Sequence, residues 1–117
     1  MQGCDGFQAH VSHLDGSVVV AVTGEIDLAT APHFRAVLEA AATATNRVIV
    51  DCDQLTFIDS CGLRELVFAS NALVGRGSLT LRNVHEAQMR VLTVTGLADY
   101  LTIQERLPTA VENESRP

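Results

Sequence analysis

A single serine in this chain is placed where it could accept a phosphate. Ser60 lies in the string FIDSCGL, between an extended segment and the start of a predicted helix. The first amides of a helix have no partner within it, and they lie at the positive end of the helix dipole. Serine is a favoured cap for such amides, and a phosphate is stabilised at the same place. Two interpretations are therefore open, a plain helix cap and a phosphorylation site.

The two residues after Ser60 raise further questions of chemistry. Cys61 is a thiol at a helix terminus, where the dipole can activate a nucleophile. No His accompanies it in a motif and no GxxxxGK[ST] phosphate loop is present, so the sequence does not indicate an enzyme. Gly62 costs a helix about 1 kcal/mol relative to alanine. It predicts a close approach there, either by a partner's backbone or by a strand of the same domain.

Apolar patterning predicts the elements that would position this serine. Residues 7–14 and 17–23 are expected to be strands, joined by a turn at Asp15–Gly16 and with Gly24 ending the second. Thr30, as a capping side chain, and Pro32 mark the start of a helix that ends near residue 46.

The second half of the chain continues this alternation. A strand is expected at 47–51, with an extended or irregular stretch at 54–58. Gly75 and Gly77 end the helix that Ser60 opens. A strand at 78–82 precedes a third helix, capped by Asn83 and ending near residue 95, and residues 101–103 form a last strand or part of a closing helix. The predicted buried face of the second helix, from which Glu65 is excluded, comprises Leu63, Leu66, Val67, Ser70, Leu73 and Val74.

This order predicts an α/β fold. An N-terminal hairpin followed by right-handed crossovers gives a mixed β-sheet whose later strands are parallel, packed with three to four helices. The chain's 117 residues suit one domain. We expect it to span residues 7–106, with a flexible N-terminus at 1–6 and a frayed tail at 107–117.

Charge and cysteine content exclude several classes of function. The chain has 14 carboxylates, eight basic residues and a net charge of −6, and its arginines are scattered. Direct contact with nucleic acid or with an anionic membrane is therefore not expected. No apolar stretch approaches the roughly 20 residues that cross a bilayer, and no signal peptide is visible. The three cysteines, Cys4, Cys52 and Cys61, are an odd number and lack metal-ligand spacing. They indicate neither a disulfide framework nor a zinc site, so we expect a cytoplasmic protein without a metal or cofactor.

Several blocks of the sequence together resemble the STAS domain. They are VVVAVTGEID (18–27), VIVDCD (48–53), FIDSCGL (57–63), GSLTLRNV (77–84) and TGL (95–97). More narrowly, they are similar to the bacterial anti-sigma factor antagonists of the sporulation and general-stress pathways. The resemblance covers residues 7–105 in the same order throughout, and its most specific part is the DS-x-GL string.

The resemblance implies a protein–protein switch. In the family, the unmodified antagonist binds an anti-sigma factor that is also a GHKL-type serine kinase, and this binding frees the sigma factor. The kinase then phosphorylates the serine of DS-x-GL, here Ser60, the complex dissociates, and a PP2C-type phosphatase restores the hydroxyl. Asp27 and Asp59 match acidic positions near that serine. The expected contact surface comprises Asp27, Asp59, Cys61, Gly62 and Arg64.

Three residues depart from the family pattern. Cys61 stands where Ser or Thr is usual. Cys52 replaces an aliphatic residue and is expected to fill a small space in the core. Arg64 replaces a frequent glycine, and it either contacts an acidic partner or is simply solvated. An alternative function is a STAS subunit that regulates a transporter or a larger signalling assembly, and the sequence leaves the oligomeric state open.

Overall fold

The computed structural model describes residues 6–104. The predicted flexible N-terminus at 1–6, Gly6 apart, and the predicted tail at 107–117 lie outside these residues. In chain order the elements are β1 (Phe7–Leu14), β2 (Ser17–Ile26), α1 (Ala31–Ala44), β3 (Arg47–Ile58), α2 (Ser60–Leu73), β4 (Ser78–Arg82), α3 (Glu86–Val94), α4 (Leu97–Tyr100) and β5 (Thr102–Ile103).

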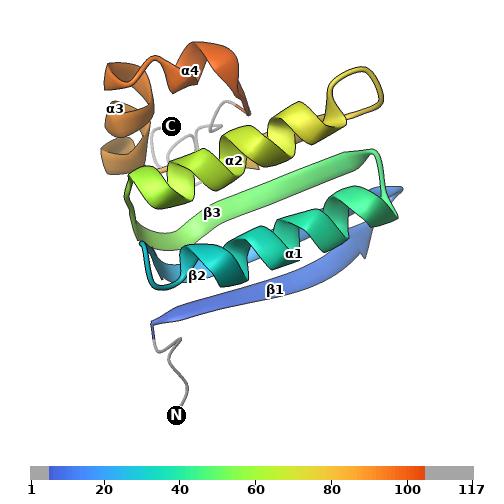
Figure 1. Ribbon diagram of the computed structural model, residues 1–117, viewed down its shortest axis with the longest axis horizontal. Coiled ribbons are helices and arrows are strands. Elements are labelled where there is room, and N and C mark those ends of the chain that lie inside the picture. Colours follow the sequence, from blue (N-terminus) through green and yellow to red (C-terminus); the bar gives the residue numbers. More distant parts are fainter. Residues whose placement is uncertain (1–5, 105–117) are drawn as a thin grey trace, which may run out of the picture.

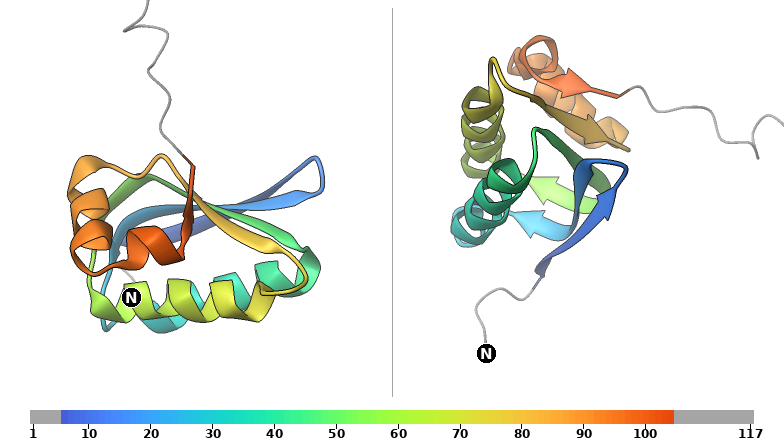
Figure 2. Two further views of the ribbon diagram at one scale, coloured as in Figure 1. Left: turned by 90° about the horizontal axis from the view of Figure 1, so that it is seen from above. Right: turned by 90° about the vertical axis from the view of Figure 1, so that its right-hand side faces the viewer.

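One mixed sheet organises the molecule and confirms the predicted α/β class. Its strand order is β1-β2-β3-β4-β5, with β1 antiparallel to β2 and every other neighbouring pair parallel. Helices α1 and α2 lie side by side along one face of this sheet (Figures 1 and 2). Helix α2 lies between α1 and the short helices α3 and α4, and the Tyr100 hydroxyl of α4 donates to Oδ1 of Asn71 in α2. Within residues 6–104, no helix is both long and apolar enough to span a bilayer.

Two strands are longer than the sequence predicts. β2 continues to Ile26, although Gly24 was expected to end it, and β3 runs unbroken through the stretch expected to be irregular. The register between them shifts at two places, between Ala21 and Thr23 and between Gly24 and Glu25, and the pairing resumes after each shift, as it does at a β-bulge. Gly24 itself has φ +97° and lies against the carbonyl of Gly6, which leaves no room for a side chain. The glycine therefore marks a close approach of β2 to the backbone of Gly6 and not the end of the strand.

Two predicted helix caps are wrong. Thr30 precedes α1 as expected, but its hydroxyl makes no capping hydrogen bond with the helix. Asn83 does not begin α3, which starts at Glu86 after His85. Asn83 instead has φ +59°, and its side-chain amide donates to the Asp51 carboxylate at 3.1 Å. In both cases the side chain binds a group outside the helix, in the segment before α1 for Thr30 and on β3 for Asn83.

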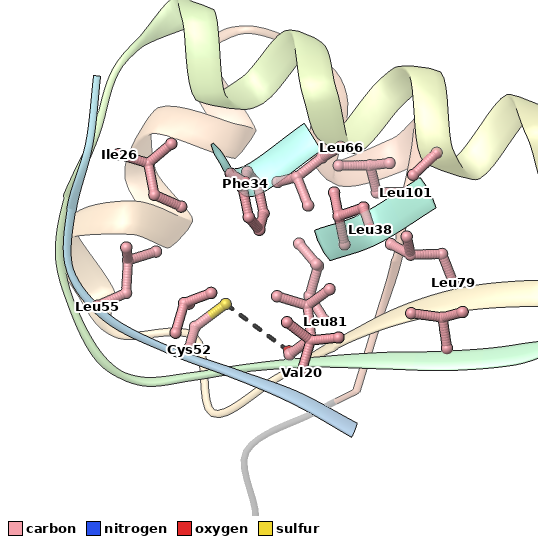
Figure 3. Packing of buried hydrophobic residues seen from close by; sticks show 14 of the residues in the cluster. Val20, Ile26, Phe34, Leu38, Cys52, Leu55, Leu66, Leu79, Leu81 and Leu101 are labelled. Carbon is pink, nitrogen blue, oxygen red and sulfur yellow. Dashed lines mark hydrogen bonds between the residues drawn. The ribbon is translucent and has the colours of Figure 1, made fainter. Parts of the chain in front are cut away.

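The core lies between the sheet and the helices α1 and α2 (Figure 3). Cys52 is buried in it, and its thiol donates to the Val50 carbonyl oxygen at 3.8 Å. Burial, with a smaller contribution from the charge of Asp51, raises the pKa of the Cys52 thiol to about 12, so the group is neutral at pH 7. The predicted role of Cys52 as a small core residue is confirmed. Fully buried large side chains include Phe7, Val20, Ile26, Phe34, Leu38, Leu73 and Leu81.

Candidate functional site

The site is assembled where β2 and β3 end together. Their last residues pair as Ile26 with Ile58. The backbone amide of Asp59 then donates to the Ile26 carbonyl oxygen at 3.0 Å. Each strand leads through a short connection into a helix, β2 into α1 and β3 into α2. The carboxyl ends of adjacent parallel strands therefore bring the Asp27 loop next to Ser60, at the edge where α/β proteins commonly bind their ligands.

Ser60 is exposed and is the first residue of α2. The interpretation of Ser60 as the helix cap is wrong, because Asp59 occupies that position. The Asp59 carboxylate accepts the amides of Cys61 at 2.8 Å and Gly62 at 3.3 Å. Among residues 6–104, no side chain or backbone group makes a hydrogen bond with the Ser60 hydroxyl. The fold thus leaves this hydroxyl accessible and gives it no structural task.

Asp27 organises the loop that faces Ser60. Its Oδ1 accepts the amides of Ala29 at 3.0 Å and Thr30 at 3.1 Å. The Thr30 hydroxyl accepts the amide of Asp27 at 2.9 Å and lies 3.0 Å from the Glu25 carbonyl oxygen. Asp27 and Thr30 therefore fix each other's positions between β2 and α1. Sequence reasoning placed Thr30 in the loop expected to contact the partner but gave its side chain the role of a helix cap, although its spacing of three residues from Asp27 is the signal for such a turn.

The structure explains Gly62 by packing within the domain. A Cβ at this position would lie 2.6 Å from Cγ2 of Ile26 and 2.7 Å from Cγ1 of Ile58. These distances are too short for a non-bonded contact between carbon atoms, so only glycine lets α2 begin this close to the strand ends. Of the two interpretations of Gly62, the close helix–strand contact is the one that the structure contains.

Cys61 and Arg64 line a shallow hollow on the same side of the molecule as Ser60. The hollow has a volume of about 240 Å³. Arg64 is exposed, and Leu28 in the β2–α1 loop is 75% exposed beside it. We call this hollow the Cys61 hollow. It is lined by Leu28, Ala31, Pro32, Arg35, Cys61, Arg64 and Glu65. An apolar side chain and two arginines are thus presented together next to the candidate phosphoacceptor.

An ion pair joins α1 to α2 at the wall of the Cys61 hollow. Arg35 Nε lies 2.9 Å from Glu65 Oε1, and Glu65 is buried while Arg35 is half-exposed. The Arg35 guanidinium also lies over the ring of Phe68, 5.6 Å from its centroid. The prediction that Glu65 lies off the buried face of α2 is wrong, because its charge is compensated from α1. Val74, predicted to lie on that face, is 71% exposed.

The groups presented at this site are the exposed Ser60 hydroxyl, the exposed Arg64 and the exposed apolar side chain of Leu28. Among the described residues, no His or carboxylate forms a hydrogen bond with the Cys61 thiol. No three His, Cys, Asp or Glu side chains converge as metal ligands anywhere between residues 6 and 104.

Comparisons with known proteins agree with this architecture. The family model described as the STAS domain matches residues 8–110. A relative from Listeria monocytogenes, named an anti-sigma-B factor antagonist, is 33% identical over 94 residues, which is 79% of each chain.

Solved structures share the fold. The crystal structure of an anti-sigma factor antagonist from Mycobacterium paratuberculosis has a TM-score of 0.79 and 24% identity, covering 98% of this chain and 97% of that one. The phosphorylated form of the Bacillus cell fate determinant SpoIIAA has a TM-score of 0.63 and 24% identity, covering 94% and 97%. With a family model matched over most of its length and a relative above 30% identity, the chain belongs to the STAS domain family.

Proposed function

We propose that this protein is an anti-sigma factor antagonist controlled by phosphorylation at Ser60. In its unmodified form it binds an anti-sigma factor that is also a GHKL-type serine kinase, and so releases the sigma factor in the cytoplasm. Phosphorylation of Ser60 by that kinase ends the binding, and a PP2C-type phosphatase restores it. The observation that carries the proposal is the exposed Ser60 hydroxyl, which makes no hydrogen bond within the described residues because Asp59 caps α2.

The expected effect of the phosphate is local and electrostatic. A phosphoserine adds a charge of about −1.5 to −2 to the contact surface. At about 6 Å and an effective dielectric constant of about 20, each pair of like unit charges costs about 2.8 kcal/mol. Since about 1.4 kcal/mol is a factor of ten in affinity, one such pair weakens binding about a hundredfold. Asp27 and Asp59 make the same surface more negative, so an acidic group or a nucleotide phosphate on the partner would meet several charges.

The proposed contact surface extends from Ser60 across the Cys61 hollow. Leu28 supplies exposed apolar area there, and Arg64 supplies a positive charge for an acidic group of the partner. Asp27 acts through the loop that it holds in place. Gly62 contributes by letting α2 start close to the strand ends and not by direct contact.

The test is phosphorylation by the candidate kinase. The chain is incubated with ATP and an anti-sigma factor kinase from the same organism, and the intact mass and the modified peptide are then determined. We expect one added phosphate, mapped to Ser60, with loss of the complex. Ser60→Ala should remain unmodified and bound, whereas Ser78→Ala, a change at another exposed serine, should behave as the original chain does.

A chain that no kinase phosphorylates would point to the alternative function. Absence of phosphate with every kinase of this class, together with stable binding to a transporter or scaffold, would contradict the proposal. It would support the alternative of a STAS subunit in a larger assembly, and Ser60 would then be an ordinary exposed residue of α2.

A further inference from the structure

The outer edge of β1 has no strand beside it among the described residues (Figures 1 and 2). This strand is long for an edge, with eight residues, and it pairs with β2 without interruption from Phe7 opposite Gly24 to Leu14 opposite Ser17. An uninterrupted edge presents a regular row of backbone donors and acceptors to any strand that approaches it.

The residues of β1 do not protect this edge. Native proteins block edge strands with lysine, other charges, proline or a bulge. The sequence of β1, FQAHVSHL, contains no proline and no Asp, Glu, Lys or Arg, although the chain carries 14 carboxylates. Val11 and Leu14 are 46% and 52% exposed. The strand is therefore suited to pairing with another strand and not to preventing it.

An apolar groove runs alongside this edge, between β1 and α1. Its volume is about 440 Å³. We call it the β1–α1 groove. It is lined by Val11, His13, Val18, His33, Ala36, Val37, Ala40, Ala41 and Ala44. None of them is acidic or an arginine. In a chain with a net charge of −6, two copies can therefore meet here without opposing their carboxylates.

The strand is complementary to itself in one register. Side chains alternate between the two faces, so a second strand must keep the face of Val11 toward the helices. A two-fold axis through Val11 meets this condition. It pairs Val11 with Val11 of the second copy and His10 with its Ser12, and it places no two histidines of the paired strands opposite each other.

We propose that two copies of this chain associate through β1, joining their sheets into one. The two-fold axis through Val11 puts both α1 helices on the same face of the joined sheet, so that the two β1–α1 grooves open toward each other. The Cys61 hollow lies on the other side of α1, against α2, and Ser60 stays exposed. The association is thus independent of the proposed phosphorylation.

The first test is the mass of the full chain in solution, measured by light scattering or sedimentation over a range of concentrations. We expect the mass to rise from 12.5 kDa toward twice that value. Val11→Lys places like charges on the axis and should weaken association at least tenfold. At concentrations where both chains are monomeric, its melting temperature should match that of the original chain, because Val11 is half-exposed. Val94→Lys, the same change at a valine that is 79% exposed on α3, should have no effect. Ser60→Ala should associate like the original chain.

The second test fixes the register. In a chain whose Cys4 and Cys61 are replaced by serine, Val11→Cys should form a disulfide between two copies, because residues facing across a two-fold axis lie within bonding range. Leu14→Cys should not, because its counterpart lies at the other end of the paired strands. A chain that remains at 12.5 kDa at every concentration overturns the proposal, as does cross-linking at Leu14 without cross-linking at Val11.

Discussion

At the start of α2, Asp59 caps the helix and Ser60 presents an exposed hydroxyl, although either side chain could act as the cap. Both are favoured helix caps, so their order in the sequence does not say which of them caps. The backbone decides it, since Asp59 is extended, with φ −108°, and Ser60 already belongs to the helix. Of the two interpretations that the sequence left open for Ser60, the capping role is wrong, because Asp59 caps the helix. The correction strengthens the functional proposal, because the hydroxyl is free of a capping contact.

Removing the cap should destabilise the protein. Asp59→Ala deletes the acceptor of the Cys61 and Gly62 amides, and we expect a loss of about 1 kcal/mol in the free energy of unfolding. Urea denaturation measures it. Asp59→Asn keeps a capping oxygen and should lose much less, which separates the cap from the charge. If Asp59→Ala were as stable as the original chain, the capping assignment would be wrong.

At the scale of elements, the order of strands and helices follows from local patterns, but the boundaries depend on tertiary partners. The hairpin turn and the apolar periods of α1 and α2 are visible in the sequence. The continuity of β3 is not, because it depends on register shifts against β2. Neither is the burial of Glu65, whose compensating charge comes from Arg35, 30 residues earlier. Asn83 was assigned to a cap for the same reason, since its actual partner, Asp51, lies on β3, 32 residues earlier.

Helix α2 begins in close contact with the ends of β2 and β3, and this contact requires glycine at position 62. Gly62→Ala improves helix propensity by about 1 kcal/mol, yet overpacking costs typically 1–3 kcal/mol, and the contacts with Ile26 and Ile58 place this site at the upper end. We expect net destabilisation, measured by chemical denaturation.

A double-mutant cycle identifies the cause of that loss. Ile58→Ala removes one of the two clashing side chains, so its combination with Gly62→Ala should cost less than the sum of the two changes. Strict additivity, or a stability of Gly62→Ala equal to that of the original chain, would contradict the contact described here.

At the scale of the whole molecule, helix α1 separates two surfaces. One, shared with α2, carries the Cys61 hollow and lies beside Ser60, while the other, shared with β1, carries the apolar β1–α1 groove. The hairpin-plus-crossover topology creates both, since it stacks α1 and α2 side by side and leaves β1 at an edge. The topology was predictable from the sequence. The two surfaces were not, because each combines residues that are distant along the chain.

The central claim is that a phosphate at Ser60 changes partner affinity without changing the fold. The measurement that tests it most directly compares the unmodified chain with a chain carrying phosphoserine introduced at position 60 during synthesis. Affinity for the anti-sigma factor kinase and amide NMR spectra are recorded for both. We expect affinity to fall at least about a hundredfold, with spectral changes confined to the β2–α1 loop and the start of α2. Equal affinity of the two forms, or spectral changes throughout the sheet, would contradict the account.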